Sequence, residues 1–201
     1  MLDRFMRPLI DPPLNRLGRR LSAAGFTANQ VTLAGAAVGL LAALLVAFGA
    51  FLPALILLLL GRLADGLDGA IARHQGKTDF GGYLDITMDF LIYGAIPAGF
   101  VAYDPAGNGL AGALLLTAFY VNGASFLGFA ILAEKRKMET TAQGEKTLFY
   151  SNGLLEGTET ILFFAVILIF PTAFAPLALA FAALTVTTTA LRLKAAYEIF
   201  R

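Results

Sequence analysis

Four aspartates stand at helical spacing in the stretch from residue 65 to residue 89, DGLDGAIARHQGKTDFGGYLDITMD. Asp65 and Asp68 are three residues apart, and Asp85 and Asp89 are four residues apart. On a helix, such pairs lie on one face, separated by about 60° and about 40° around the axis. Two neighbouring helices that each carry such a pair can present four carboxylates to one point between them.

The turn between the two pairs sets the depth of each carboxylate. HQGKTDF (74–80) is predicted to join two antiparallel, neighbouring helices. At about 1.5 Å per residue, Asp68 and Asp85 lie roughly 6–8 Å from this turn, and Asp65 and Asp89 roughly 12 Å from it. The four acids are therefore expected to form two matched layers.

Four ionised carboxylates at membrane depth need a counter-charge. One isolated carboxylate costs several kcal/mol, and neighbours of like charge add to that cost. Either some of the acids are protonated or cations bind them. A site made of carboxylate oxygens suits magnesium, manganese or calcium better than zinc. Four acids in two layers can hold two divalent ions, an arrangement that recurs in phosphoryl-transfer enzymes.

The residues around the acids fit an approaching ligand. Gly66, Gly69, Gly81 and Gly82 remove side chains where a ligand could come close to the backbone. Arg73, near the end of the first acidic helix, is placed to meet a phosphate or a nucleotide. Acids inside a helix bundle also mark ion pathways, so a divalent-cation transporter stays open on this evidence.

The composition places these acids in a membrane protein. Of the 201 residues, 58% are hydrophobic and 14% are charged, and the mean hydropathy is +0.73. A soluble domain carries nearer a quarter charged residues. Residues 30–60 alone are long enough to cross hydrocarbon twice, since roughly 20 apolar residues make one pass. We therefore expect an all-α membrane protein.

Two segments are predicted along the chain. Residues 1–26 form an amphipathic juxtamembrane segment on the membrane surface, broken at Pro8 and at Pro12-Pro13. Residues 27–201 form one domain of six transmembrane helices, whose first helix begins at a Thr27 capping box.

The six helices are expected at 28–49, 52–74, 81–103, 110–134, 153–172 and 175–198. DPAGNG (104–109) is predicted to be a turn. The small-residue pattern GAAVG (35–39) in the first helix is typical of close helix packing.

The basic residues give this layout an orientation. With six spans, both termini and the loops at 74–80 and 134–152 share one side of the membrane. All 15 lysines and arginines lie on that side or in helix segments approaching it, and the three opposite loops contain none. Because cytoplasmic loops are enriched in Lys and Arg, we expect both termini and the acidic site on the cytoplasmic side of a bacterial inner membrane.

The acids and glycines together resemble the signature of the CDP-alcohol phosphotransferases. Every fixed position of that signature is filled, by Asp65-x-x-Asp68-Gly69-x-x-Ala72-Arg73, seven further residues, and Gly81-x-x-x-Asp85-x-x-x-Asp89. TANQVT (27–32) is similar to the TPNxxT stretch of the family, with Ala28 in place of proline. The six-helix layout extends the resemblance over most of the chain.

The resemblance implies an integral-membrane enzyme of phospholipid synthesis. Similar enzymes cleave the pyrophosphate linkage of a CDP-linked donor and pass a phosphatidyl or phosphoalcohol group to a hydroxyl, releasing CMP. By this resemblance, Asp65, Asp68 and Asp85 would bind two Mg²⁺ or Mn²⁺ ions, with Asp89 as shared ligand and general base. The residues implied at the CDP moiety are Asn29, Thr32, Asp68, Gly69, Ala72, Arg73 and Gly81.

The acceptor is expected to be a small alcohol. Family members with phosphorylated acceptors resemble one another in placing arginines near the start of the fifth helix, where this chain has GLLEGTET (153–160). The glutamates there would repel a phosphate and attract an ammonium group, which favours an unphosphorylated or amino alcohol. Candidate acceptor contacts are Lys135, Glu156, Glu159 and Arg192.

The leading interpretation is transfer of a phosphatidyl group from CDP-diacylglycerol to this alcohol. The reverse use of the lipid is the first alternative, with CDP-choline or CDP-ethanolamine as donor and diacylglycerol as acceptor. A cation transporter and a non-catalytic membrane scaffold are alternatives of other classes, and the intact aspartate set argues against the scaffold. Membrane lipids are expected as partners and nucleic acid is not, while a homodimer stays open.

Overall fold

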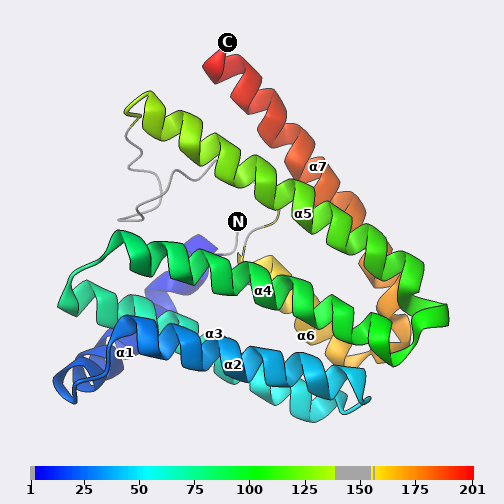
Figure 1. The fold of residues 1–201 in the computed structure, drawn as a ribbon, viewed down its shortest axis with the longest axis horizontal. Helices are drawn as coiled ribbons and strands as arrows, with labels where there is room; N and C mark the ends of the chain where they lie inside the picture. The colour runs from blue at the N-terminus through cyan, green and yellow to red at the C-terminus, as the bar shows by residue number, and fades with distance from the viewer. Residues whose placement is uncertain (1–2, 139–154, 156) are drawn as a thin grey trace.

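The computed structural model describes residues 3–138, 155 and 157–201, with only the backbone described at 3–9. The described chain is almost entirely α-helical (Figure 1). The elements are α1 (Asp3–Ala23), α2 (Ala28–Ala47), α3 (Phe51–Gln75), α4 (Asp79–Tyr103), α5 (Pro105–Lys135), α6 (Gly157–Ile169), the 3₁₀ turn η1 (Pro171–Ala173) and α7 (Phe174–Phe200). The all-α prediction is confirmed.

The described helices include four that are long and apolar enough to cross a membrane, namely α2, α4, α5 and the continuous η1–α7 segment. Helix α6 is apolar but has only 13 residues. Helix α3 has 25 residues, but it carries Arg62, Asp65 and Asp68 among its apolar residues. A polytopic membrane protein is supported on these grounds, and the count of six spans stays a prediction.

Helix α2 is the element on which the two acidic helices pack. Helices α3 and α4 run antiparallel and are joined by a short connection, as predicted, but each packs mainly along α2. The two helices are therefore neighbours through α2, with little direct contact between their backbones. The small residues of α2 draw both helices onto it, which leaves space for acidic side chains between α3 and α4. Figure 1 shows this group beside the α5–α7 pair.

Two glycines explain the close approach to α2. A Cβ atom added at Gly35 would lie 2.9 Å from the Ala64 Cβ of α3, and one added at Gly39 would lie 2.6 Å from the Ile92 Cδ1 of α4. Such distances are shorter than real Cβ contacts. The constraint is firmer at Gly35, because the Ala64 Cβ is fixed to its backbone, whereas the end of the Ile92 side chain can shift. The close-packing interpretation of GAAVG (35–39) is confirmed.

Replacing Gly35 by alanine is expected to destabilise the protein by about 1–3 kcal/mol, because the new methyl group overpacks the α2–α3 contact. The measurement is the thermal unfolding midpoint of the purified protein in detergent. Gly94→Ala is the matched control, since a Cβ there meets nothing within 4 Å. That control should be neutral or stabilising by up to about 1 kcal/mol, because alanine favours the helix. Equal destabilisation by both changes would contradict the packing argument.

The ends of several helices differ from the predicted bounds. Helix α2 begins at the predicted capping box, with the Gln30 amide donating to Thr27 Oγ1 and the Thr27 amide to Gln30 Oε1. Residues 105–109 are helical rather than a turn, because Pro105 occupies the first turn and Asp104 Oδ1 accepts from the Gly107 amide at 3.0 Å. Of the expected 153–172 helix, α6 covers 157–169, and residues 153, 154 and 156 lie outside the described part of the chain.

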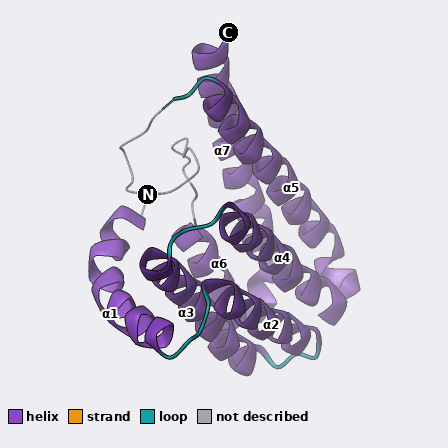
Figure 2. Ribbon diagram, turned by 60° about the vertical axis from the view of Figure 1, so that its left-hand side comes forward, coloured by secondary structure: helices purple, strands orange, loops and turns teal. Residues whose placement is uncertain are grey.

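Helix α1 continues without a break through Pro8 and Pro12-Pro13, so the predicted interruption is wrong. Proline donates no backbone hydrogen bond, and α1 is held on α3 by packing. Leu14 is buried against Leu67 and Ala70 of α3, and Gly18 lets the two backbones meet at Ala70. Figure 2 shows α1 alongside α3. The membrane-surface role of residues 1–26 stays a prediction.

Candidate metal and nucleotide site

Three of the four aspartates meet between α3 and α4. Each of Asp65, Asp68 and Asp85 offers a carboxylate oxygen, and these oxygens all lie within 4.8 Å of one another. Asp65 and Asp68 come from one face of α3, and Asp85 comes from the facing side of α4, as the helical spacing predicts. An all-oxygen cluster of this size fits a hard divalent cation.

The Asp68 carboxylate is the most buried of the three. Asp68 is 5% exposed, and its Oδ2 accepts a hydrogen bond of 2.5 Å from the Thr32 hydroxyl of α2. The Thr32 hydroxyl oxygen also lies 3.0 Å from the carbonyl oxygen of Ala28. A residue one turn into α2 thus orients the carboxylate of α3 that is furthest from water.

Thr32→Val is expected to lower CMP release about tenfold, because a hydrogen bond to a charged group contributes about 1.5–3 kcal/mol. Valine keeps the shape of the side chain and removes only the hydroxyl. Thr32→Ser keeps a hydroxyl that can donate the hydrogen bond to Asp68, so it should keep most of the activity. The measurement is the initial rate of CMP formation at saturating Mn²⁺ and donor. Equal rates for the valine variant and the wild type would exclude a role for this hydroxyl.

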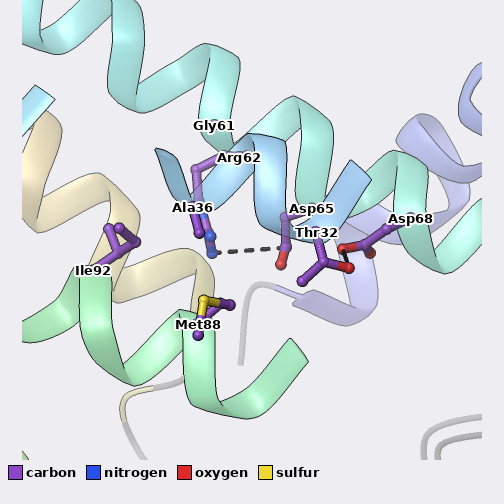
Figure 3. A pocket seen from close by; sticks show the side chains of 9 residues that line it. Thr32, Ala36, Gly61, Arg62, Asp65, Asp68, Met88 and Ile92 are labelled. Carbon is purple, nitrogen blue, oxygen red and sulfur yellow. Dashed lines mark hydrogen bonds and ion pairs between the residues drawn. The ribbon is translucent and has the colours of Figure 1, made fainter. Parts of the chain in front are cut away.

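Asp89 of α4 contacts Arg62, which lies on α3 one turn before Asp65. Its Oδ1 accepts a 2.7 Å hydrogen bond from Arg62 Nη1, and the same nitrogen lies 3.6 Å from Asp65 Oδ2. In Figure 3, Arg62 extends toward Asp65, on the side of the site away from Asp68 and Thr32. The deeper of the two predicted layers, Asp65 and Asp89, is therefore bridged by a guanidinium group.

These groups line a small pocket between α2, α3 and α4 (Figure 3). Its polar wall consists of Thr32, Arg62, Asp65 and Asp68, and Met88 and Ile92 of α4 belong to its apolar wall.

The residues implied at the CDP moiety come from three helix ends. Asn29 and Thr32 lie in the first turns of α2, and Gly81 lies in the first turn of α4, where its amide donates to Thr78 Oγ1. A Cβ at Gly81 would lie 3.3 Å from Asn29 Oδ1, so these two helix ends are adjacent. The α3 members of the set are Asp68, Gly69, Ala72 and Arg73.

Arg73 is anchored by the N-terminal helix. Its Nε and Nη2 donate to Asn15 Oδ1 at 3.0 and 2.8 Å, while its Nη1 would lie 3.7 Å from a Cβ at Gly69. Helix α1 therefore contributes to one edge of the candidate site, a contact that no local pattern of residues predicts. The CDP-contact assignments stay predictions.

The candidate acceptor residues lie on other elements. Lys135 is exposed in the last turn of α5, Glu159 is partly buried in the first turn of α6, and Glu156 falls outside the described residues. Arg192 is buried on α7, where its Nη1 donates to Asn122 Oδ1 at 2.9 Å and to Ser125 Oγ at 2.8 Å. These assignments also stay predictions.

Comparison with known proteins decides the family. A family model described as CDP-alcohol phosphatidyltransferase matches residues 26–192. The chain belongs to this family. It is a membrane phosphotransferase of phospholipid biosynthesis, which confirms the resemblance carried by the aspartate signature.

Relatives cover the chain to different extents. An inner membrane protein of Escherichia coli (strain K12), YnjF, is 47% identical over 197 residues, which are 98% of this chain and 96% of that protein. An archaetidylinositol phosphate synthase of Pyrococcus horikoshii is 39% identical over 105 residues, which are 49% of this chain and 56% of that enzyme.

A solved structure shares the fold. The phosphatidylinositol phosphate synthase of Mycobacterium tuberculosis, crystallised with CDP-DAG bound, superimposes with a TM-score of 0.66 at 24% identity, covering 90% of this chain and 92% of that one. Its complex with manganese and citrate gives the same TM-score at 23% identity.

Arg62 is the residue of this CDP-alcohol phosphatidyltransferase that sequence reasoning missed. It precedes Asp65 by three residues, so it stands on the same helix face. An arginine that follows a long apolar run and stands one turn before Asp65 is the signal in the sequence. From the sequence, only metal ions were expected to neutralise the acids.

Proposed function

We propose that this protein transfers the phosphatidyl group of CDP-diacylglycerol to the hydroxyl of a small alcohol and releases CMP, using two Mg²⁺ or Mn²⁺ ions. The observation that carries the proposal is the cluster of Asp65, Asp68 and Asp85, with carboxylate oxygens within 4.8 Å of one another, in a chain of the CDP-alcohol phosphatidyltransferase family. The signature of the family coincides with this cluster.

The carboxylate oxygens of the cluster fit divalent ions. Asp65, Asp68 and Asp85 supply only carboxylate oxygens, and these are the ligands that Mg²⁺ and Mn²⁺ prefer. Asp89 is the fourth proposed ligand. When bound, the ions would neutralise the diphosphate and stabilise the charge on the transferred phosphorus and on the departing CMP.

The protein's own groups perform the remaining tasks. Asp89 accepts the proton of the acceptor hydroxyl as its oxygen attacks the phosphorus, and the bond from phosphorus to the CMP oxygen breaks. Thr32 orients the Asp68 carboxylate. Asn29, Gly69, Ala72, Arg73 and Gly81 surround the nucleotide, with Arg73 donating hydrogen bonds to a phosphate or to the base.

The proposed setting is a bacterial inner membrane, with both termini and the site facing the cytoplasm. The excess of Lys and Arg on one side supports this orientation. A water-soluble alcohol would then reach the site from the cytoplasm while the donor's acyl chains stay in the bilayer. A homodimer is compatible with the exposed apolar helix faces.

Two acceptor classes compete. The absence of arginine in GLLEGTET (153–160), together with Glu159, favours an unphosphorylated or amino alcohol. The names of relatives such as the archaetidylinositol phosphate synthase favour a phosphorylated polyol, for which buried Arg192 and exposed Lys135 offer positive charge. We place the unphosphorylated alcohol first, because the glutamates stand where other members carry arginines.

The test is CMP release by the purified protein with CDP-diacylglycerol and Mn²⁺, one alcohol at a time. Serine, ethanolamine, glycerol and inositol represent the unphosphorylated class, and glycerol 3-phosphate and inositol phosphate represent the phosphorylated class. Parallel reactions with CDP-choline or CDP-ethanolamine and diacylglycerol test the reversed use of the lipid. Metal uptake into proteoliposomes without any nucleotide would support the transporter instead. No CMP from any combination would contradict the proposed function.

A further inference from the structure

Arg62 is a charged residue in an otherwise apolar part of α3. Its side chain is 19% exposed, and it follows the run PALILLLLG (53–61). A cation at membrane depth is costly unless it is paired, and such residues are rare in transmembrane helices. Arg62 has two partners, Asp89 at 2.7 Å and Asp65 at 3.6 Å, so its charge is compensated within the pocket.

The two partners are also proposed metal ligands. A divalent ion held by Asp65 and Asp89 would bring two positive charges close to the guanidinium group, and like charges at such a distance repel strongly where water is scarce. The electrostatic energy of the guanidinium group in this position is thus favourable when no metal is bound and unfavourable when a metal ion lies beside it. An arginine side chain is long enough to turn away while its Cα stays in place.

We propose that Arg62 forms ion pairs with Asp89 and Asp65 when no divalent ion is bound, and that its ion pair with Asp89 breaks when an ion binds. This inference rests on the proposed function, because it takes both carboxylates to be metal ligands. Arg62 then stabilises the metal-free protein and weakens metal binding.

A purely structural ion pair between α3 and α4 is the competing explanation. Such a pair would stabilise the protein to the same extent with and without metal, and its loss would not change the affinity for Mn²⁺. The two explanations therefore differ in how the effect of Arg62 depends on metal.

The experiment uses the full chain in detergent, as wild type, Arg62→Gln and Arg62→Lys, with Arg20→Gln as the control for an exposed arginine on α1. Electron paramagnetic resonance titrations give the Mn²⁺ affinity. Thermal unfolding in EDTA and in saturating Mn²⁺ gives the stability of each state. Neither readout requires turnover.

Arg62→Gln should bind Mn²⁺ about tenfold more tightly than the wild type, because a nearby positive charge is gone. Its unfolding midpoint should fall in EDTA and recover largely in Mn²⁺. Arg62→Lys, which keeps the charge but not the guanidinium geometry, should gain about threefold in affinity. If Arg62→Gln does not fold, the Mn²⁺ affinity of Arg62→Lys still tests the proposal.

Equal loss of stability in EDTA and in Mn²⁺, with unchanged Mn²⁺ affinity in either Arg62 variant, would overturn the inference. Failure of the proposed function appears elsewhere. If the wild type releases no CMP in the alcohol screen, the proposed function fails. If the wild type binds Mn²⁺ and releases CMP, but the variants show unchanged Mn²⁺ affinity and equal loss of stability in both states, only the role of Arg62 is contradicted.

Discussion

Asp68→Asn is expected to reduce CMP release by roughly a hundred- to a thousandfold, the loss seen when one group that stabilises transition-state charge is removed. Asp68 is 5% exposed and stands among three carboxylates whose oxygens lie within 4.8 Å of one another. Asparagine keeps the volume of the side chain and an oxygen that can accept from Thr32. The change therefore removes charge and leaves packing intact.

The same variant should bind Mn²⁺ much more weakly, because a neutral amide oxygen replaces an anionic ligand. Asp79→Asn is the matched control, since Asp79 is an exposed aspartate in the first turn of α4. Initial rates and Mn²⁺ titrations of both variants make the comparison. Wild-type rates in Asp68→Asn would exclude the carboxylate cluster as the reaction centre.

Asp89→Asn is expected to lower CMP release by about 10²–10⁴-fold, the usual contribution of general-base catalysis. Binding of the CDP-linked donor should stay largely intact, because the proposed nucleotide contacts lie nearer the loop ends of α2, α3 and α4. The measurements are single-turnover CMP release and equilibrium binding of the donor. Full turnover by this variant would contradict the base assignment.

Because Asp89 pairs with Arg62, Asp89→Asn can lose activity through lower stability as well as through loss of the base. The side chains of Arg62 and Asp89 are 19% and 30% exposed, and Asp65 remains 3.6 Å from Arg62, so the loss of stability should stay below about 3–5 kcal/mol, the loss expected when a fully buried pair loses one partner. The unfolding midpoint of Asp89→Asn therefore has to be measured beside its activity. Asp89→Glu keeps the carboxylate and should retain more activity than Asp89→Asn at similar stability.

Much of the site follows from local periodicity. The spacing of Asp65, Asp68 and Asp85 predicted that they would face one another, and their oxygens do meet. The Thr27–Gln30 capping box and the glycine contacts of α2 were also predicted from local patterns. Helical geometry is repetitive, so residues that share a face can be identified without knowing what the helix packs against.

Long-range placement did not follow from the sequence. The spacing of Asp89 fits the acid cluster as well as that of Asp85, yet Asp89 contacts Arg62. The continuity of α1 through Pro12-Pro13 depends on packing against α3, and the burial of Arg192 depends on its pairing with Asn122 across the α5–α7 contact. Each outcome is decided by a partner far away in the chain.

Composition, hydropathy and helical spacing are local properties, so a helical membrane protein with an acidic signature on two helices could be predicted from the residues alone. The three-dimensional packing was needed to show that both of those helices pack on α2, that Thr32 orients Asp68, and that an arginine lies in the layer of Asp65 and Asp89. The physical reason is that hydrogen bonds and ion pairs depend on distances between helices. Those distances are set by packing, here at Gly35 and Gly39, rather than by the residues that make the contacts.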